Sequence, residues 1–119
     1  MKCNKVLIVE DDQAIRQTIQ DVLELNGYEV FTAVNGADGI RQLKNISPDS
    51  CVVLLDLMMP GTNGWQFLDV QRNDPVLCKV PVVICSAYKE SAKAVHPDAF
   101  IEKPIQLNSL LGTVKELCA

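Results

Sequence analysis

The sequence lacks any cluster of lysine or arginine and any apolar run long enough to cross a bilayer. Its net charge is −4, whereas a basic patch is the usual electrostatic footprint of a protein that binds nucleic acid or an anionic membrane. A membrane-spanning helix needs about 20 consecutive apolar residues, and residues 1–5 lead into a short apolar run without the features of a signal peptide. We therefore expect a cytoplasmic protein that binds neither nucleic acid directly nor a membrane.

Cysteine motifs for metal binding or disulfide formation are also missing, although cysteines are present. They are Cys3, Cys51, Cys78, Cys85 and Cys118. No pair has the Cys-x-x-Cys spacing, and two of the cysteines lie inside apolar runs. This usage is typical of reduced thiols in a cytosolic protein and not of a disulfide framework or a zinc site. The single histidine, His96, precedes Pro97 in a polar segment and is expected at the surface.

What the sequence does contain is a regular alternation of short apolar runs and segments of helical spacing. With 119 residues, of which 48% are hydrophobic, the chain is long enough for one domain with its own core. The apolar runs predict strands at 5–9, 28–33, 51–55, 80–85 and 99–101. Helical spacing predicts helices at 15–23, 36–45, 65–73, 89–95 and 107–118. This order predicts a three-layer α/β/α domain in which right-handed crossovers join parallel strands.

The fourth of these crossovers is short. Only residues 87–98 join the fourth strand to the fifth, close to the practical minimum of about a dozen residues for a parallel connection. The room left suits a helix of roughly two turns at most, at 89–95, or none, and the pair His96-Pro97 prevents its extension. We therefore expect a shortened fourth helix and a smaller, more mobile surface around it.

Residues with chemically useful side chains follow four of the predicted strands. Glu10 and Asp11 follow the first, Asp56 the third, Ser86 the fourth and Lys103 the fifth. In open α/β sheets these carboxyl ends meet at one edge, where ligands bind. Crowded carboxylates repel one another unless one is protonated or a cation lies among them, and hard oxygen ligands suit Mg²⁺. Metal, ammonium and hydroxyl together could stabilise a phosphoryl group on Asp56.

Each of these residues also has a simpler explanation when it is considered alone. Asp11 and Asp12 could cap the first helix, and Ser86 could cap the next short one. Lys103 could form an ordinary salt bridge. Packing alone, however, does not explain why all four strand ends carry the required groups together.

Four motifs stand in the order that is typical of one family. Val-Glu-Asp-Asp covers 9–12, Leu-Asp-Leu-Met-Met-Pro-Gly-x-x-Gly covers 55–64, Cys-Ser-Ala covers 85–87 and Glu-Lys-Pro covers 102–104. With these motifs the chain resembles a response regulator receiver domain over essentially its whole length. The resemblance implies that 1–119 is one receiver domain, without an output domain inside it. It also implies the flavodoxin-like fold, a five-stranded parallel sheet of strand order 2-1-3-4-5.

The resemblance further implies how the site works. Asp56 would be the phosphoacceptor, taking a phosphoryl group from a histidine kinase or a histidine phosphotransfer protein in a Mg²⁺-dependent reaction. Asp11 would bind the metal directly and Glu10 mostly through water. Asp56 and the backbone carbonyl of Met58 would complete the protein's share of the metal ligands.

Three further residues acquire roles by the same resemblance. Ser86 and Lys103 would contact the phosphoryl oxygens, and Phe100 would be the switch aromatic that responds together with Ser86. The partner-binding face would then change and signal to a downstream protein. A cis bond between Lys103 and Pro104 is expected as well, because it would direct the lysine ammonium back toward Asp56.

Two other functions compete with this one. A receiver-like binding domain that works without phosphorylation would be favoured by loss of the acceptor, the acid pair or the lysine, and none is lost. A phosphatase of the haloacid dehalogenase type needs a second aspartate two residues after the first, where this chain has Met58, and more residues for a cap. The leading hypothesis is therefore a signalling switch that catalyses only its own phosphorylation and dephosphorylation.

Overall fold

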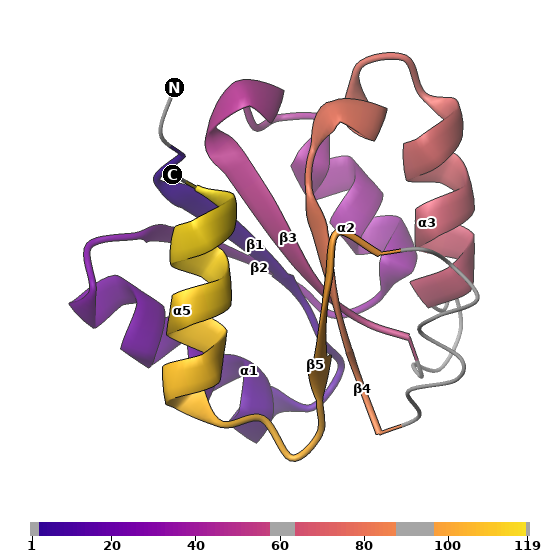
Figure 1. Ribbon diagram of the computed structural model, residues 1–119. Helices are drawn as coiled ribbons and strands as arrows, with labels where there is room; N and C mark the ends of the chain where they lie inside the picture. Colours follow the sequence, from indigo (N-terminus) through magenta and orange to yellow (C-terminus); the bar gives the residue numbers. More distant parts are fainter. Residues whose placement is uncertain (1–2, 58–63, 88–96, 119) are drawn as a thin grey trace.

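The computed structural model describes residues 3–57, 64–87 and 97–118. The strands form one parallel sheet of order β2-β1-β3-β4-β5 (Figure 1). They are β1 (Lys5–Val9), β2 (Glu29–Ala33), β3 (Cys51–Asp56), β4 (Val82–Ser86) and β5 (Ala99–Glu102). The predicted fold class, strand order and parallel pairing are confirmed.

Helices cover both faces of this sheet (Figure 1). The described helices are α1 (Gln13–Leu25), α2 (Gly36–Leu43), α3 (Gly64–Asn73) and α5 (Leu107–Leu117), with short 3-10 turns at Pro48–Ser50 and Leu77–Lys79. The expected short fourth helix at 89–95 lies outside the described residues and stays a prediction. None of the described helices is long and apolar enough to cross a membrane.

Two hydrophobic cores lie on opposite faces of the sheet because successive strand side chains point in opposite directions. On one face Val53 and Leu55 of β3 pack with Leu43 of α2 and Phe67 of α3. On the other face the alternate β3 residues pack against α1 and α5. Every residue of β3 is buried, as the uninterrupted apolar run at 51–55 predicts. The central strand therefore ends, at Asp56, between two packed layers.

The helix boundaries follow from specific caps. Asp12 begins α1, where its carboxylate accepts a hydrogen bond from the Ile15 N–H at 3.0 Å, and Asn35 begins α2 in the same way. The predicted end of α2 at 45 is wrong by two residues. The Asn45 N–H bonds to the Gln42 carbonyl, three residues earlier, so the helix tightens into a 3-10 turn after Leu43.

The predicted reduced state of all cysteines is wrong for one pair. Cys3 and Cys118 form a disulfide, with their Cα atoms 4.7 Å apart, and the Cys3 N–H donates to the Cys118 carbonyl. The fold brings the segment before β1 next to the end of α5. Because 115 positions separate the two cysteines, no local spacing motif could indicate their pairing. Cys51, Cys78 and Cys85 are free thiols.

Candidate functional site

The acidic residues meet at the carboxyl edge of the sheet. Val9 of β1 lies opposite Leu55 of β3, so Glu10 and Asp56 follow side by side on adjacent strands. Glu10 and Asp56 are 3% and 6% exposed, whereas Asp11 is exposed. One carboxylate oxygen from each of the three residues lies within 4.8 Å of the other two. The strand ends thus bring together the three acids that the sequence singles out.

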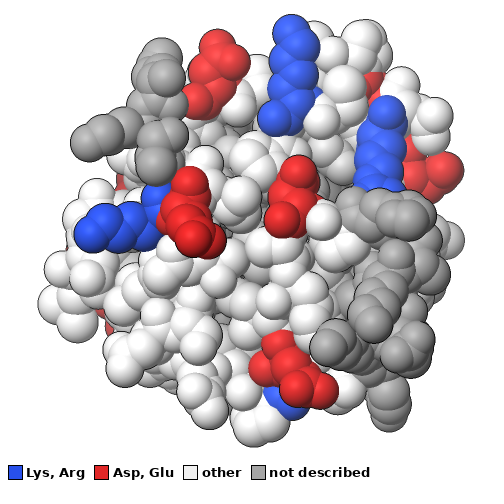
Figure 2. Space-filling view, in the orientation of Figure 1, with Lys and Arg blue, Asp and Glu red and all other residues white. Residues whose placement is uncertain are grey.

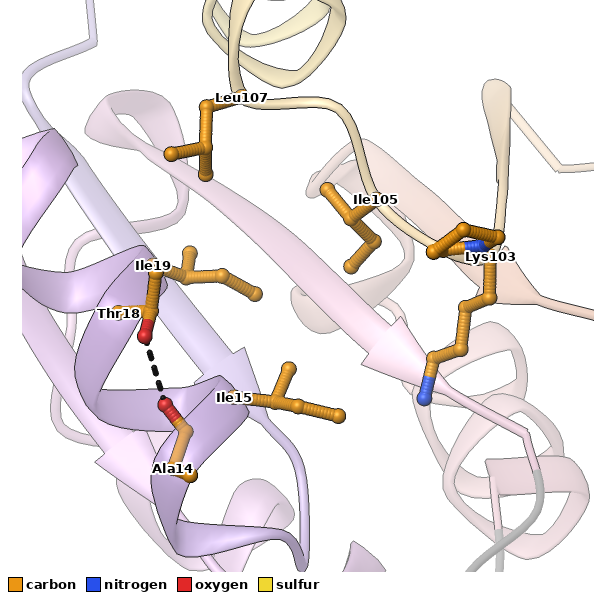
Figure 3. A pocket seen from close by; sticks show the side chains of 8 residues that line it. Ala14, Ile15, Thr18, Ile19, Lys103, Ile105 and Leu107 are labelled. Atoms are coloured by element: carbon orange, nitrogen blue, oxygen red, sulfur yellow. Dashed lines mark hydrogen bonds between the residues drawn. The ribbon is translucent and has the colours of Figure 1, made fainter.

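Lys103 completes this cluster from the end of β5. Its Nζ lies 3.0 Å from Glu10 Oε1 and 3.3 Å from Asp56 Oδ2. The backbone N–H of Lys103 donates to the Ser86 carbonyl at 2.9 Å. This bond holds the segment that follows β5 against the end of β4. The Lys103-Pro104 bond is cis, as predicted, and Figure 3 shows the lysine side chain extending toward the end of β3.

Burial makes the charge balance of this cluster unusual. Removal from water raises the pKa of Glu10 from 4.5 to about 8, and the adjacent Asp56 adds to the rise against the opposing effect of Lys103. Burial favours the neutral amine of Lys103, but the hydrogen bond to Glu10 and the two negative charges outweigh it and raise the pKa of Lys103. In the absence of a cation, burial and the adjacent Asp56 therefore favour the protonated form of Glu10.

One buried oxygen in the cluster has no hydrogen-bond partner among the described residues. It is Oε2 of Glu10, the other oxygen of the carboxylate that binds Lys103. An unpartnered buried oxygen costs free energy unless a ligand completes it. This oxygen, next to two further carboxylates, matches the hard-oxygen ligand set of Mg²⁺.

The other predicted site residues lie around this cluster or outside the described part of the chain. Ser86 ends β4 and is 2% exposed. Phe100 on β5 is half-buried and packs against the core on the α2–α3 side of the sheet. Met58, whose carbonyl the resemblance assigns to the metal, lies outside the described residues.

Gly64, the last residue of the motif at 55–64, shapes the site in a way that the motif alone does not indicate. It begins α3, and its N–H donates to the Leu57 carbonyl. A Cβ atom there would lie 2.6 Å from the Asp56 carbonyl oxygen and 2.6 Å from the Leu57 Cα. Only glycine lets α3 begin this close to the end of β3.

The surface next to the cluster carries an apolar hollow of about 310 Å³. It lies between α1 and the segment after β5, where Ile15, Ile19 and Ile105 point inward (Figure 3). Lys103 borders this hollow, but Glu10, Asp11 and Asp56 do not line it. Figure 2 shows acidic and basic side chains interspersed on one face of the molecule, without a basic patch among the described residues seen there.

The arrangement so far is a buried aspartate at a strand end, two further acids, a lysine and a serine on neighbouring strand ends. Residues 6–115 match the family model of the response regulator receiver domain. The chain belongs to the response regulator receiver domain family. It is a phosphoacceptor switch of two-component signalling. Receiver domains take a phosphoryl group from histidine kinases and bind Mg²⁺ at an acidic cluster, and they are not enzymes in the usual sense.

The similarity to known proteins extends over nearly the whole chain. Protein PilG of Pseudomonas aeruginosa is 28% identical over 93% of this chain and 84% of its own length. The phosphate regulon transcriptional regulatory protein PhoB of Klebsiella pneumoniae is 32% identical over 93% of this chain, which spans only 50% of PhoB. The structure of chemotaxis response regulator CheY4 of Vibrio cholerae matches with a TM-score of 0.85 and 28% identity, covering 97% of this chain and 98% of CheY4.

Proposed function

We propose that residues 1–119 form one receiver domain in which Asp56 accepts the phosphoryl group. The single observation that carries this assignment is the position of Asp56 at the end of the central strand, with Oδ2 3.3 Å from Lys103 Nζ. An Asp56 carboxylate oxygen would form the new P–O bond while the P–N bond of a phosphohistidine breaks. The bonding electron pair then leaves with the imidazole nitrogen.

Glu10, Asp11 and Asp56 are the side chains that would hold Mg²⁺, with the Met58 carbonyl as a further ligand. Two observations support this fit: Oε2 of Glu10 has no hydrogen-bond partner within the described part of the chain, and three carboxylates cluster within 4.8 Å. When bound, Mg²⁺ offsets part of the negative charge of the phosphoryl oxygens. A bound cation would also oppose the burial and the neighbouring charge that raise the pKa of Glu10.

Lys103 and Ser86 would stabilise the phosphoryl group after transfer. The ammonium already contacts both buried acids, so it can interact with an anionic oxygen at the same place without a large movement. Ser86 supplies a hydroxyl donor from the end of β4. Reorientation of Ser86 and Phe100 would then alter the partner-binding face around β5, and hydrolysis of the aspartyl phosphate would reset the switch.

The donor would be a histidine kinase or a histidine phosphotransfer protein, and the phosphorylated face would bind a downstream protein. We place the domain in the cytoplasm, where such donors present their phosphohistidines. Direct contact with nucleic acid or a membrane is not part of the proposed function, consistent with the net charge of −4.

The experiment that tests this function is incubation with acetyl phosphate and Mg²⁺, followed by intact-mass measurement. Wild-type protein should gain one phosphoryl group, and Asp56→Asn should gain none. Asp21→Asn is the matched control, because Asp21 is exposed on α1 and bonds to Gln17. Removal of Mg²⁺ with a chelator should abolish the gain.

Two results would contradict the proposal. A phosphoryl group that persists in Asp56→Asn would mean that another residue is the acceptor. An absence of any mass gain in the wild type, from acetyl phosphate and from phosphorylated kinase alike, would favour a receiver-like binding domain that works without phosphorylation.

A further inference from the structure

Arg16 on α1 connects the helix to the loop that carries the acids. Its Nη1 donates hydrogen bonds to the Glu10 carbonyl at 2.8 Å and to the Asp11 carbonyl at 3.4 Å. The backbone N–H of Arg16 donates to the Asp12 carbonyl at 3.0 Å, which is the first i→i−4 bond of α1. The side chain of this half-buried residue therefore bonds to two consecutive carbonyls of the loop that carries Glu10 and Asp11.

The two side-chain contacts of Arg16 are not needed to begin the helix. Asp12 already caps α1 through the Ile15 N–H, which satisfies the ordinary requirement of a helix N-terminus. The side chain of Arg16 instead reaches back beyond the cap to Glu10, the residue that leaves β1. Both carbonyls that accept from its guanidinium precede the helix, so the Arg16 side chain restrains the loop and not the start of α1.

The loop needs such a restraint because its acids repel one another. Glu10, Asp11 and Asp56 have carboxylate oxygens within 4.8 Å of one another. Lys103 offsets part of the repulsion between Glu10 and Asp56, and the repulsion that is left favours movement of the loop away from β3. On one side of Glu10, its N–H donates to the Ala33 carbonyl at the end of β2. Arg16 holds the other side, so both backbone groups of Glu10 are bonded.

We propose that Arg16 is a positioning residue of the magnesium site, holding the backbone of Glu10 and Asp11 so that their carboxylates face Asp56 before the cation binds. This inference rests on the proposed function, since it assigns Arg16 to the same Mg²⁺ site. Arg16 does not itself bind the metal, because a guanidinium is always protonated. It acts through the two acids whose carbonyls it binds.

The test is the affinity for MgCl₂, measured by calorimetry and by the fluorescence of Trp65, the single tryptophan, which directly follows Gly64. The variants are Arg16→Gln, Arg16→Lys and Asp11→Asn. Arg41→Gln is the matched control, because Arg41 is also a helical arginine and bonds to Asp38 within α2. Thermal unfolding without Mg²⁺ is recorded for every variant, to show that each is folded at the titration temperature.

We expect Arg16→Gln to bind Mg²⁺ about tenfold more weakly, as is typical when a residue that orients metal ligands is removed. Arg16→Lys should recover part of the loss, because an ammonium can donate to one of the two carbonyls. Arg41→Gln should match the wild type, and Asp11→Asn should lose more affinity than Arg16→Gln. A purely structural role for Arg16 would lower the unfolding temperature without changing the affinity of the folded protein.

Two outcomes would overturn the inference, and only the second would also contradict the proposed function. Weak binding by Asp11→Asn with unchanged binding by both Arg16 variants would remove Arg16 from the site but leave the proposed function intact. Unchanged binding by Asp11→Asn as well as by the Arg16 variants would show that the acids do not hold Mg²⁺, which also contradicts the metal site of the proposed function.

Discussion

The two edges of the sheet differ in how their polar groups are paired. At the carboxyl edge, Glu10 and Asp56 are buried next to each other, and one Glu10 oxygen has no partner among the described residues. At the amino edge, the Val82 N–H donates to Asp98 Oδ2 at 2.8 Å, and the Asp98 N–H donates to the Val82 carbonyl. The Cys3–Cys118 disulfide closes this same edge.

This contrast shows how stability and function are divided within one small domain. Buried carboxylates that repel one another destabilise the folded state unless a ligand binds there. Paired backbone groups and a cross-link at the opposite edge stabilise it. Changes at the amino edge should therefore alter stability with little effect on Mg²⁺ binding, whereas changes at the carboxyl edge should alter both.

The largest expected effect is loss of the disulfide at the amino edge. In the chain-entropy description, a cross-link between residues 115 positions apart stabilises the fold by about 4–5 kcal/mol. The double variant Cys3→Ser/Cys118→Ser should lose about this much unfolding free energy in urea while keeping its affinity for Mg²⁺. Cys78→Ser, at an exposed free thiol, is the control. Equal stability of the double variant and the oxidised wild type would remove the disulfide from this account.

A smaller effect is expected at the carboxyl edge for Gly64→Ala. The added Cβ would lie 2.6 Å from backbone atoms of Asp56 and Leu57, so the end of β3 or the start of α3 must shift, at a cost of about 1–3 kcal/mol. The same shift should weaken Mg²⁺ binding, because it moves Asp56.

Gly112→Ala is the matched control for this change. Gly112 lies within α5, and a Cβ there meets no atom within 4 Å. Because alanine favours a helix interior over glycine, this variant should gain about 0.5–1 kcal/mol of unfolding free energy. If both glycine variants had the same effect in urea denaturation, the close approach at Gly64 would not be the cause.

The smallest expected effect concerns the reactivity of two free thiols, one at each edge of the sheet. Cys51 begins β3 and Cys85 lies near the end of β4, and burial raises the pKa of each thiol to about 12. Little reactive thiolate exists at pH 8 in either position. In the native, oxidised protein a maleimide should therefore label one thiol, that of Cys78. After unfolding it should label three thiols. Rapid labelling of Cys85 alone would show that the carboxyl edge opens to solvent.

The sequence predicted the architecture because the relevant information is local. The continuous run at 51–55 indicates a strand buried on both faces, and the polar residue that ends each strand lies, in a parallel sheet, at one edge. The cis bond at Lys103-Pro104 followed from the family motif and is confirmed. The strand order followed from the family resemblance, and the gathering of the three acids followed from the alternation of strands and helices.

What the sequence did not indicate depends on contacts between distant segments or on backbone atoms. The partner of Cys3 is known only once α5 is packed beside β1. The role of Gly64 depends on its distance to the Asp56 carbonyl, and that of Arg16 on carbonyls of the acidic loop. Side-chain patterns do not record contacts with backbone atoms, so Arg16 cannot be told by sequence from an ordinary helical arginine. The motif at 55–64 contains Gly64 but does not say why glycine is required there.

The central claim is that the carboxyl edge destabilises the metal-free fold, and the pH dependence of unfolding tests it most directly. The pKa of Glu10 is about 8 in the folded state, against the ordinary value of 4.5 that applies in the unfolded chain. Between these two pH values the folded state therefore binds more protons than the unfolded state. The unfolding free energy without Mg²⁺ should therefore fall as pH rises from 5 to 8, by at most about 1.4 kcal/mol per pH unit. Glu10→Gln should lack this slope, and saturating Mg²⁺ should offset it in the wild type. A wild-type protein whose stability without Mg²⁺ rises over this range, or parallels that of Glu10→Gln, would contradict the account.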